Sequence, residues 1–199
     1  MNFIFERVKT ICNVLQEFMQ TTVEEMDGFI YAPGEYKETS NQPPKDGWQP
    51  FQKGGRLSGV DKHFWFRKAF TTPQAQQGKQ LYFNLTTGRE GGWDAKNPQC
   101  IVYLDGKMVQ GLDVNHTDLP LEFGKTYEMA IYLYVGMLEG PIDFLPVLKL
   151  VDTRIEKLYY DLHVPLDASL CFEDTDENLS LIHISKRGEL RIFFARKLL

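Results

Sequence analysis

Apolar residues recur with helical spacing at the start of the chain, over residues 3–20. They lie three or four positions apart and form one stripe on a helix: Ile4, Val8, Ile11, Leu15 and Phe18. The residues that follow include the β-branched run 21–23, which lowers helix propensity, and the turn signal Asp27-Gly28. The pattern predicts an N-terminal helix within residues 1–26.

The spacing of apolar residues changes to two between residues 63 and 152. The longest example alternates over nine residues: Tyr127, Met129, Ile131, Leu133 and Val135. Shorter runs occupy residues 63–70, 81–85 and 147–151, and Asp105-Gly106 separates two further runs as a hairpin turn does. Several short strands between Gly, Pro and Asp turns are typical of an antiparallel β-sandwich.

A long irregular segment, residues 27–61, leads into these strands. It is rich in Pro and Gly, which leaves few backbone donors for a regular ladder. Trp48 and Phe51 lie within it, and free linkers rarely carry such aromatic residues. We therefore expect this segment to be pinned onto the sandwich, and we assign residues 27–152 to one β domain.

Helical spacing returns after residue 152. Thr153 and Glu156 have the spacing of a capping box, and an apolar stripe follows that Pro165 is expected to kink or interrupt. Residues 153–178 are therefore predicted to be a helical linker. Residues 179–199 are basic and apolar and continue no earlier pattern, so we expect this tail not to be native sequence.

Composition and charge exclude several classes of protein. The chain has 199 residues and a net charge of -5, without a basic stretch that would favour nucleic acid. No apolar run is long enough to span a membrane, and the N-terminus lacks the pattern of a secretory signal. Three widely spaced cysteines fit reduced thiols in the cytoplasm better than a disulfide framework.

Two loops carry side chains suited to binding. The first, residues 87–99, combines glycines with Trp93, Asp94, Asn97 and Gln99, which suits a sugar or a partner surface. It is equally typical of a sandwich-edge loop in which Trp93 serves as a buried anchor.

The second loop holds Asp113, Asn115 and His116. Its spacing matches none of the tight zinc patterns, so a polar loop held by its own hydrogen bonds is favoured over a metal site. The sequence contains no Gly-x-Ser-x-Gly nucleophile motif, and no catalytic residue is assigned.

Five segments in order resemble the N-terminal region of cytosolic and bacterial alpha-mannosidases of glycoside hydrolase family 38. They are residues 61–68, 91–99, 102–106, 109–116 and 156–162. The resemblance implies a jelly-roll, galactose-binding-like sandwich followed by a separate catalytic domain. In that family the catalytic domain uses zinc and an Asp nucleophile for retaining hydrolysis of alpha-mannosides. The letters of its His-x-Asp motif occur here at residues 116–118, but inside the sandwich match, so the zinc site is not carried over.

The resemblance implies a non-catalytic domain that is inactive alone and works with a catalytic domain in the full-length protein. Zinc is expected in that missing domain, and neither a metal nor another cofactor is expected in this chain. The loop residues would form a lip near the substrate or an interface with the next domain. A mannose-containing glycan and a second copy of the chain are candidate partners. The alternatives are a stand-alone carbohydrate-binding module and a pure assembly domain.

Overall fold

The computed structural model describes residues 3–35, 43–91, 97–137 and 140–170. The chain divides into two compact units. One is helical and combines Met1–Gln20 with Asp152–Leu199, and the other is the β-rich stretch Thr21–Val151. Each unit is described by itself below.

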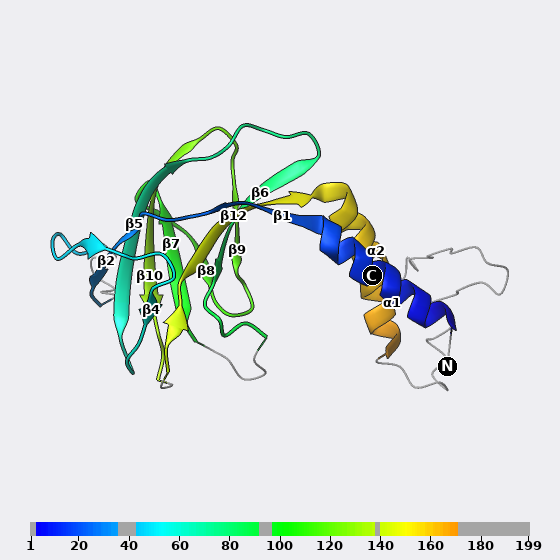
Figure 1. The fold of residues 1–199 in the computed structure, drawn as a ribbon, viewed down its shortest axis with the longest axis horizontal. Helices are drawn as coiled ribbons and strands as arrows, with labels where there is room; N and C mark the ends of the chain where they lie inside the picture. The colour runs from blue at the N-terminus through cyan, green and yellow to red at the C-terminus, as the bar shows by residue number, and fades with distance from the viewer. Residues whose placement is uncertain (1–2, 36–42, 92–96, 138–139, 171–199) are drawn as a thin grey trace, which may run out of the picture. The chain divides into compact units, whose positions relative to one another are not determined.

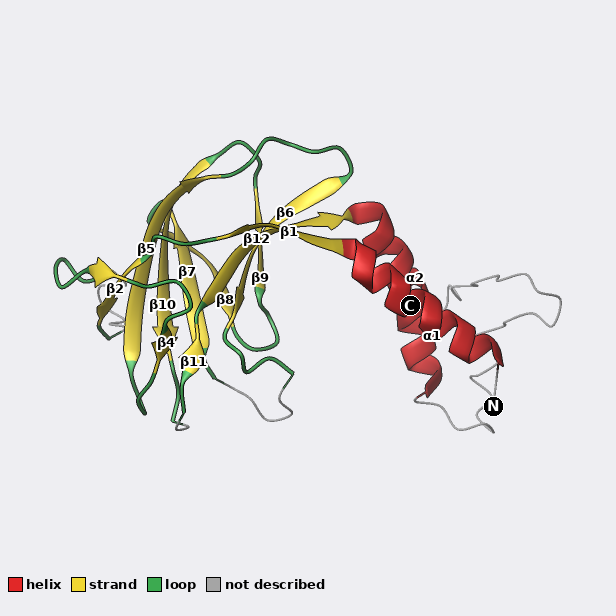
Figure 2. Ribbon diagram, in the orientation of Figure 1, coloured by secondary structure: helices red, strands yellow, loops and turns green. Residues whose placement is uncertain are grey.

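The β-rich unit is built from two main sheets (Figures 1 and 2). The six-stranded sheet has the order β3 (Gln49–Pro50), β2 (Ile30–Pro33), β5 (His63–Thr71), β10 (Thr126–Tyr134), β7 (Gln99–Leu104) and β8 (Lys107–Leu112). The four-stranded sheet has the order β1 (Gln20–Glu25), β12 (Leu145–Asp152), β6 (Lys79–Thr86) and β9 (Asp118–Leu121). A two-stranded ribbon joins β11 (Ile142–Asp143) to β4 (Arg56–Leu57).

The chain passes repeatedly from one sheet to the other. It goes from β5 to β6 and back to β7, then from β8 to β9 and back to β10. This connectivity is that of a jelly roll, in which each sheet covers the apolar face of the other. The predicted mainly β, antiparallel jelly-roll sandwich with an N-terminal helix and a C-terminal helical segment is confirmed.

The core lies between the sheets and follows the alternation in the sequence. All five alternating residues of the run 127–135 are buried there, as are Leu81, Phe83 and Leu85 of β6. The intervening residues of β10 point to the outer face of the six-stranded sheet. Tyr132 of β10 packs there with Trp65 and Tyr103 in a second, smaller apolar cluster.

The predicted hairpin between β7 and β8 is confirmed. Asp105 has a φ of 51° and Gly106 a φ of 76°, so both turn residues are left-handed. A two-residue turn with this geometry matches the twist of antiparallel strands, and it favours Gly at its second position.

The lead-in segment is held on the sandwich by its aromatic residues, as expected. The ring of Phe51 lies 5.2 Å from that of Phe66 in the core, measured between centroids. The guanidinium of Arg67 lies 4.6 Å from the centroid of Trp48. The segment also contains the short strands β2, β3 and β4. The sequence did not predict them, because the Pro and Gly content indicated an irregular backbone.

The helical unit pairs α1 (Phe3–Met19) with α2 (Thr153–Leu170). Among the residues of this unit that the structure describes, Cys12, Met19 and Tyr159 are the buried apolar side chains. The covered face of α1 agrees with the predicted stripe only in part: Val8 and Leu15 are half-buried, whereas Ile11 and Phe18 are exposed. A helix of 3.6 residues per turn allows neighbouring stripes, and only packing against α2 decides which of them is covered.

Local details at the helix ends differ from the predictions. The N-terminal cap of α2 is Asp152, whose Oδ1 accepts hydrogen bonds from the backbone N–H groups of Arg154 and Ile155. The helix continues through Pro165 to Leu170. Gln20–Glu25 forms strand β1, within the segment expected to belong to the N-terminal helix, because its β-branched residues suit an extended backbone.

The tail 179–199 and the last part of the predicted linker lie outside the described residues. Neither of the two described helices is long and apolar enough to cross a membrane.

Candidate functional site

A groove with a volume of about 630 Å³ lies on the six-stranded sheet, at the ends of its central strands. We call it the sheet groove. Strand register places its residues side by side: Tyr134 of β10 lies opposite His63 of β5 and opposite Gln99 of β7. Two further residues of the lining, Asp61 and Asp113, come from the segments beside these strands.

Stacked rings form one wall of the sheet groove. The centroids of His63 and Tyr134 are 4.9 Å apart, with their planes 27° from parallel. The hydroxyl of Tyr132 lies 2.6 Å from Nδ1 of His63 and orients that ring. The side chain of His63 is thus held in the wall by a hydrogen bond within the sheet.

Asp61 lies at the mouth of this wall. Its carboxylate accepts a hydrogen bond from the Tyr134 hydroxyl, and its Oδ1 is 3.9 Å from Nε2 of His63. Burial, and then the Asp61 charge, raise the pKa of the Tyr134 hydroxyl. Tyr134 therefore stays neutral and keeps its hydroxyl proton at physiological pH.

The opposite side of the sheet groove is a tight turn around Asp113. The backbone N–H groups of Asn115 and His116 donate to Oδ1 of Asp113 at 2.8 and 2.7 Å, and Nδ1 of His116 is 3.0 Å from the same atom. Partial burial opposes ionisation of Asp113, but these hydrogen bonds and His116 outweigh it and lower the pKa of the carboxyl. Asp113 is therefore an ionised acceptor held in place by its own turn.

The loop before β7 is fixed against the end of β10. Gly136 has a φ of 92°, and a Cβ there would lie only 2.5 Å from Cβ of Asn97. The same glycine accepts a hydrogen bond from the backbone N–H of Asp61 at 2.8 Å. A side chain at position 136 would therefore disturb both edges of the groove.

The structure brings together part of the predicted site. Gln99 and Asp113 line the sheet groove, whereas Asn97 packs behind it and Asn115 and His116 are exposed on the turn beside it. Trp93 and Asp94 lie outside the described residues. Gln99 at the start of β7 and Asp113 just after β8 come together because these two strands pair as neighbours.

Sequence reasoning missed the aromatic part of the site, Tyr132 and Tyr134, together with Asp61. A signal was present: Tyr132 and Tyr134 occupy outward positions of a strand whose other face is core, where polar residues are the usual choice. Aromatic residues at such positions indicate a covered or binding face.

Together these side chains offer a flat ring surface, an amide, two carboxylates and an imidazole within one concave site. Such a set can pack against an apolar face of a ligand while exchanging hydrogen bonds with its polar edge. Cys100 borders the groove on β7, but its side chain belongs to the core between the sheets. Burial, and then the Asp113 charge, raise the pKa of its thiol to about 12, so it is no nucleophile. Within the described ranges, no group of three His, Cys, Asp or Glu side chains is placed to hold a metal ion.

Comparisons with known proteins were made for the whole chain. No family model and no curated protein matches the sequence. Among solved structures, a beta-glucuronidase of Faecalibacterium prausnitzii is similar over 67% of this chain and 32% of its own, at 13% identity and a TM-score of 0.44. The beta-glucuronidase of Ruminococcus gnavus covers 67% of this chain and 29% of its own, at 11% identity and a TM-score of 0.41.

A putative beta-galactosidase from Bacteroides fragilis is also similar, over 66% of this chain and 23% of its own, at 12% identity and a TM-score of 0.38. The chain therefore spans about a third or less of the length of these proteins.

The resemblance to family 38 alpha-mannosidases is wrong. No family model matches the sequence, and the similar structures described above are beta-glucuronidases and a putative beta-galactosidase. The structure shows why the short matches misled: residues 102–106, for example, are a core strand and a two-residue hairpin turn. Any antiparallel sandwich needs such residues, so they carry no family information.

Proposed function

We propose that the β-rich unit is a non-catalytic, carbohydrate-binding domain. The observation that carries this proposal is the sheet groove, in which the stacked rings of His63 and Tyr134 lie beside Gln99, Asp61 and Asp113. Sugars have apolar C–H faces and hydroxyl edges, and the groove offers a counterpart to each.

Asp113 of the groove is not suited to act as the acid that glycoside hydrolysis needs. A catalytic acid must keep its proton near neutral pH, so its pKa has to be raised. The hydrogen bonds of its turn instead lower the pKa of the Asp113 carboxyl. We therefore propose that the domain binds a glycan for a carbohydrate-active enzyme and that a separate catalytic domain cleaves it.

The proposed location is the cytoplasm. Cys12 and Cys100 are both free thiols and both buried, which fits a reducing compartment.

Calorimetric titration of the purified chain with neutral oligosaccharides of mannose, glucose and galactose tests the proposal. We expect binding by the wild type, an affinity about tenfold lower for Tyr134→Ala, and most of the affinity retained by Tyr134→Phe, because the ring supplies the stacking surface. Gln99→Ala should weaken binding as well, since its amide donates to sugar hydroxyls.

Matched controls are available on the same unit. The first is Tyr82→Ala, which removes a tyrosine side chain from β6 of the four-stranded sheet. The second is Gln49→Ala, which removes a glutamine side chain from β3 of the six-stranded sheet, outside the groove. Their glycan affinity should equal that of the wild type. The proposal is wrong if no oligosaccharide binds, or if Tyr134→Ala and Gln99→Ala bind as the wild type does.

A further inference from the structure

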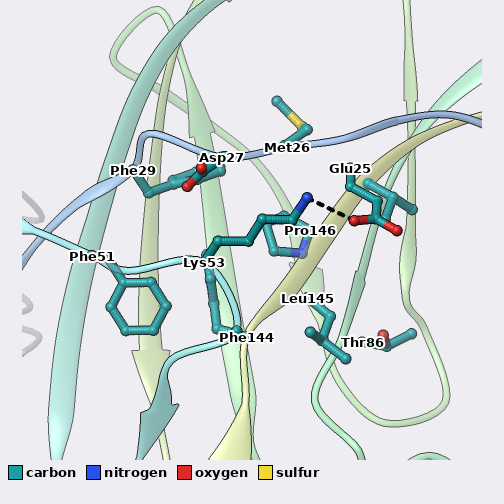
Figure 3. A pocket seen from close by; sticks show the side chains of 12 residues that line it. Glu25, Met26, Asp27, Phe29, Phe51, Lys53, Thr86, Phe144, Leu145 and Pro146 are labelled. Atoms are coloured by element: carbon teal, nitrogen blue, oxygen red, sulfur yellow. Dashed lines mark ion pairs between the residues drawn. The ribbon is translucent and has the colours of Figure 1, made fainter.

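A second cavity, of about 290 Å³, opens at an edge of the sandwich (Figure 3). We call it the edge pocket. It lies where the chain leaves β1 and crosses toward β2, beside the start of β12. Backbone hydrogen bonds hold its walls: Met26 N–H donates to the Pro146 carbonyl at 2.9 Å, and Phe51 N–H donates to the Phe29 carbonyl at 2.8 Å.

The interior of the edge pocket is apolar and aromatic. The ring of Phe144 lies 5.3 Å from that of Phe29 and 5.5 Å from that of Phe51, both edge to face. Phe29 and Phe144 belong to the buried core, so they form a rigid floor. Met26, Leu145 and Pro146 complete the apolar lining (Figure 3).

The mouth of the edge pocket carries charges of both signs. Nζ of Lys53 lies 2.7 Å from Oε2 of Glu25, and Figure 3 shows the lysine side chain extending across the pocket to reach it, with Asp27 close by. Their hydrogen bond and mutual attraction lower the pKa of Glu25 and raise that of Lys53, so both remain charged. Their side chains are 67% and 54% exposed, so water screens the pair and it can exchange partners at little cost.

We propose that the edge pocket binds a free hydrophobic α-amino acid. Its side chain would fill the space above the phenylalanine floor, its carboxylate would pair with Lys53, and its ammonium group would pair with Glu25 and Asp27. This class of ligand is the one that matches every charge at the mouth. A monocarboxylate would pair with Lys53 and break the ion pair that Lys53 makes with Glu25, which would leave Glu25 without a cation. An amine would pair with Glu25 and leave Lys53 without an anion.

Titration of the full chain with L-phenylalanine, followed by calorimetry and by amide NMR shifts, tests this site. We expect saturable binding, with shifts centred on residues 25–29, 51–54 and 144–147. 3-Phenylpropionate and phenethylamine, which each lack one charge, should bind about fivefold more weakly, and glycine should not bind because it lacks the apolar side chain.

Substitutions at the mouth leave the core intact. Lys53→Met and Glu25→Gln should each weaken phenylalanine binding about fivefold. The matched control is the pair Lys125 and Glu122, which is also exposed, has a contact of 3.0 Å and lies outside the pocket. Lys125→Met and Glu122→Gln should bind phenylalanine as the wild type does.

The proposal fails if phenylalanine does not bind, if phenethylamine or 3-phenylpropionate binds equally well, or if Lys53→Met and Glu25→Gln leave its affinity unchanged. The edge pocket and the sheet groove share no residue, so the two assignments can fail separately. Lys53→Met should keep the full oligosaccharide affinity of the groove, and Tyr134→Ala should keep the full affinity for phenylalanine.

Discussion

Cys100 illustrates how position decides the chemistry of a side chain. It lies on β7 between the groove residues Gln99 and Ile101, but its side chain is almost fully buried in the core between the sheets. Burial, followed by the nearby charge of Asp113, raises its pKa to about 12. At pH 8 only about one thiol in ten thousand is ionised at that pKa, and the thiolate is the reactive form.

We therefore expect Cys100 to resist alkylation in the folded chain. Iodoacetamide at pH 8, followed by peptide mass spectrometry, should leave Cys100 unmodified in buffer and modify it fully in urea. Cys12, which is also buried and whose pKa burial and Asp167 raise, should be protected in the same way. Rapid labelling of Cys100 without denaturant would show that the core around this thiol is open to reagent and would contradict the structure.

Three neighbouring strands of the four-stranded sheet share a polar cluster. Nζ of Lys149, on β12, lies 2.7 Å from Oδ1 of Asp118, on β9, and Nδ2 of Asn84, on β6 between them, donates to the same oxygen at 2.7 Å. The Lys149 side chain is only 10% exposed, whereas that of Asp118 is 39% exposed. The cluster therefore links three strands through one carboxylate.

Asp118→Ala should lower the free energy of unfolding by about 2 kcal/mol, because it removes a carboxylate that pairs with the buried ammonium of Lys149, while the partial exposure of Asp118 limits the loss. Urea denaturation followed by circular dichroism measures this. Adding Lys149→Met to Asp118→Ala should recover part of the stability, since the buried charge is then gone. Glu122→Ala, which breaks an exposed pair, should leave the urea midpoint unchanged. A larger loss in the double variant than in Asp118→Ala would contradict this explanation.

Helices α1 and α2 of the helical unit expose many large apolar side chains. Several large apolar side chains of α1 and α2 are more than a third exposed: Phe3, Ile11, Val14, Phe18, Leu158, Tyr160 and Val164. Exposed apolar residues gathered on one small unit favour association. If the chain forms a homo-oligomer, we therefore expect the contact to involve the helical unit.

Sedimentation velocity over a range of concentrations tests this expectation. The wild type should associate as concentration rises, and Phe18→Glu should shift the protein toward monomer. Met137→Glu is the matched control, because Met137 is 64% exposed and Phe18 65%, but Met137 belongs to the β-rich unit. A wild type that stays monomeric throughout, or an equal effect of the two substitutions, would rule out the helical unit as the site of association.

The sequence by itself determined the elements whose pattern is local and long. The alternation over residues 127–135 indicated a strand with one buried face, Asp105-Gly106 indicated the hairpin, and the apolar spacing indicated both helices. These predictions are correct because a strand or a helix repeats its own period of apolar residues along the chain. The same reasoning singled out Gln99 and Asp113, which line the sheet groove, because polar loops rich in glycine beside strands stand out in a sequence.

Only the tertiary structure decided which of these pieces meet. Strand register places His63, Gln99 and Tyr134 in one row, although they are far apart in the chain. Strands as short as β2 and β9, of four residues each, show too little of a period to be recognised in the sequence, and their pairing with β5 and β6 defines them. The edge pocket likewise combines residues from β1, the β3–β4 turn and β12. Pairing between distant segments depends on complementarity across the whole fold, which no local period in the sequence encodes.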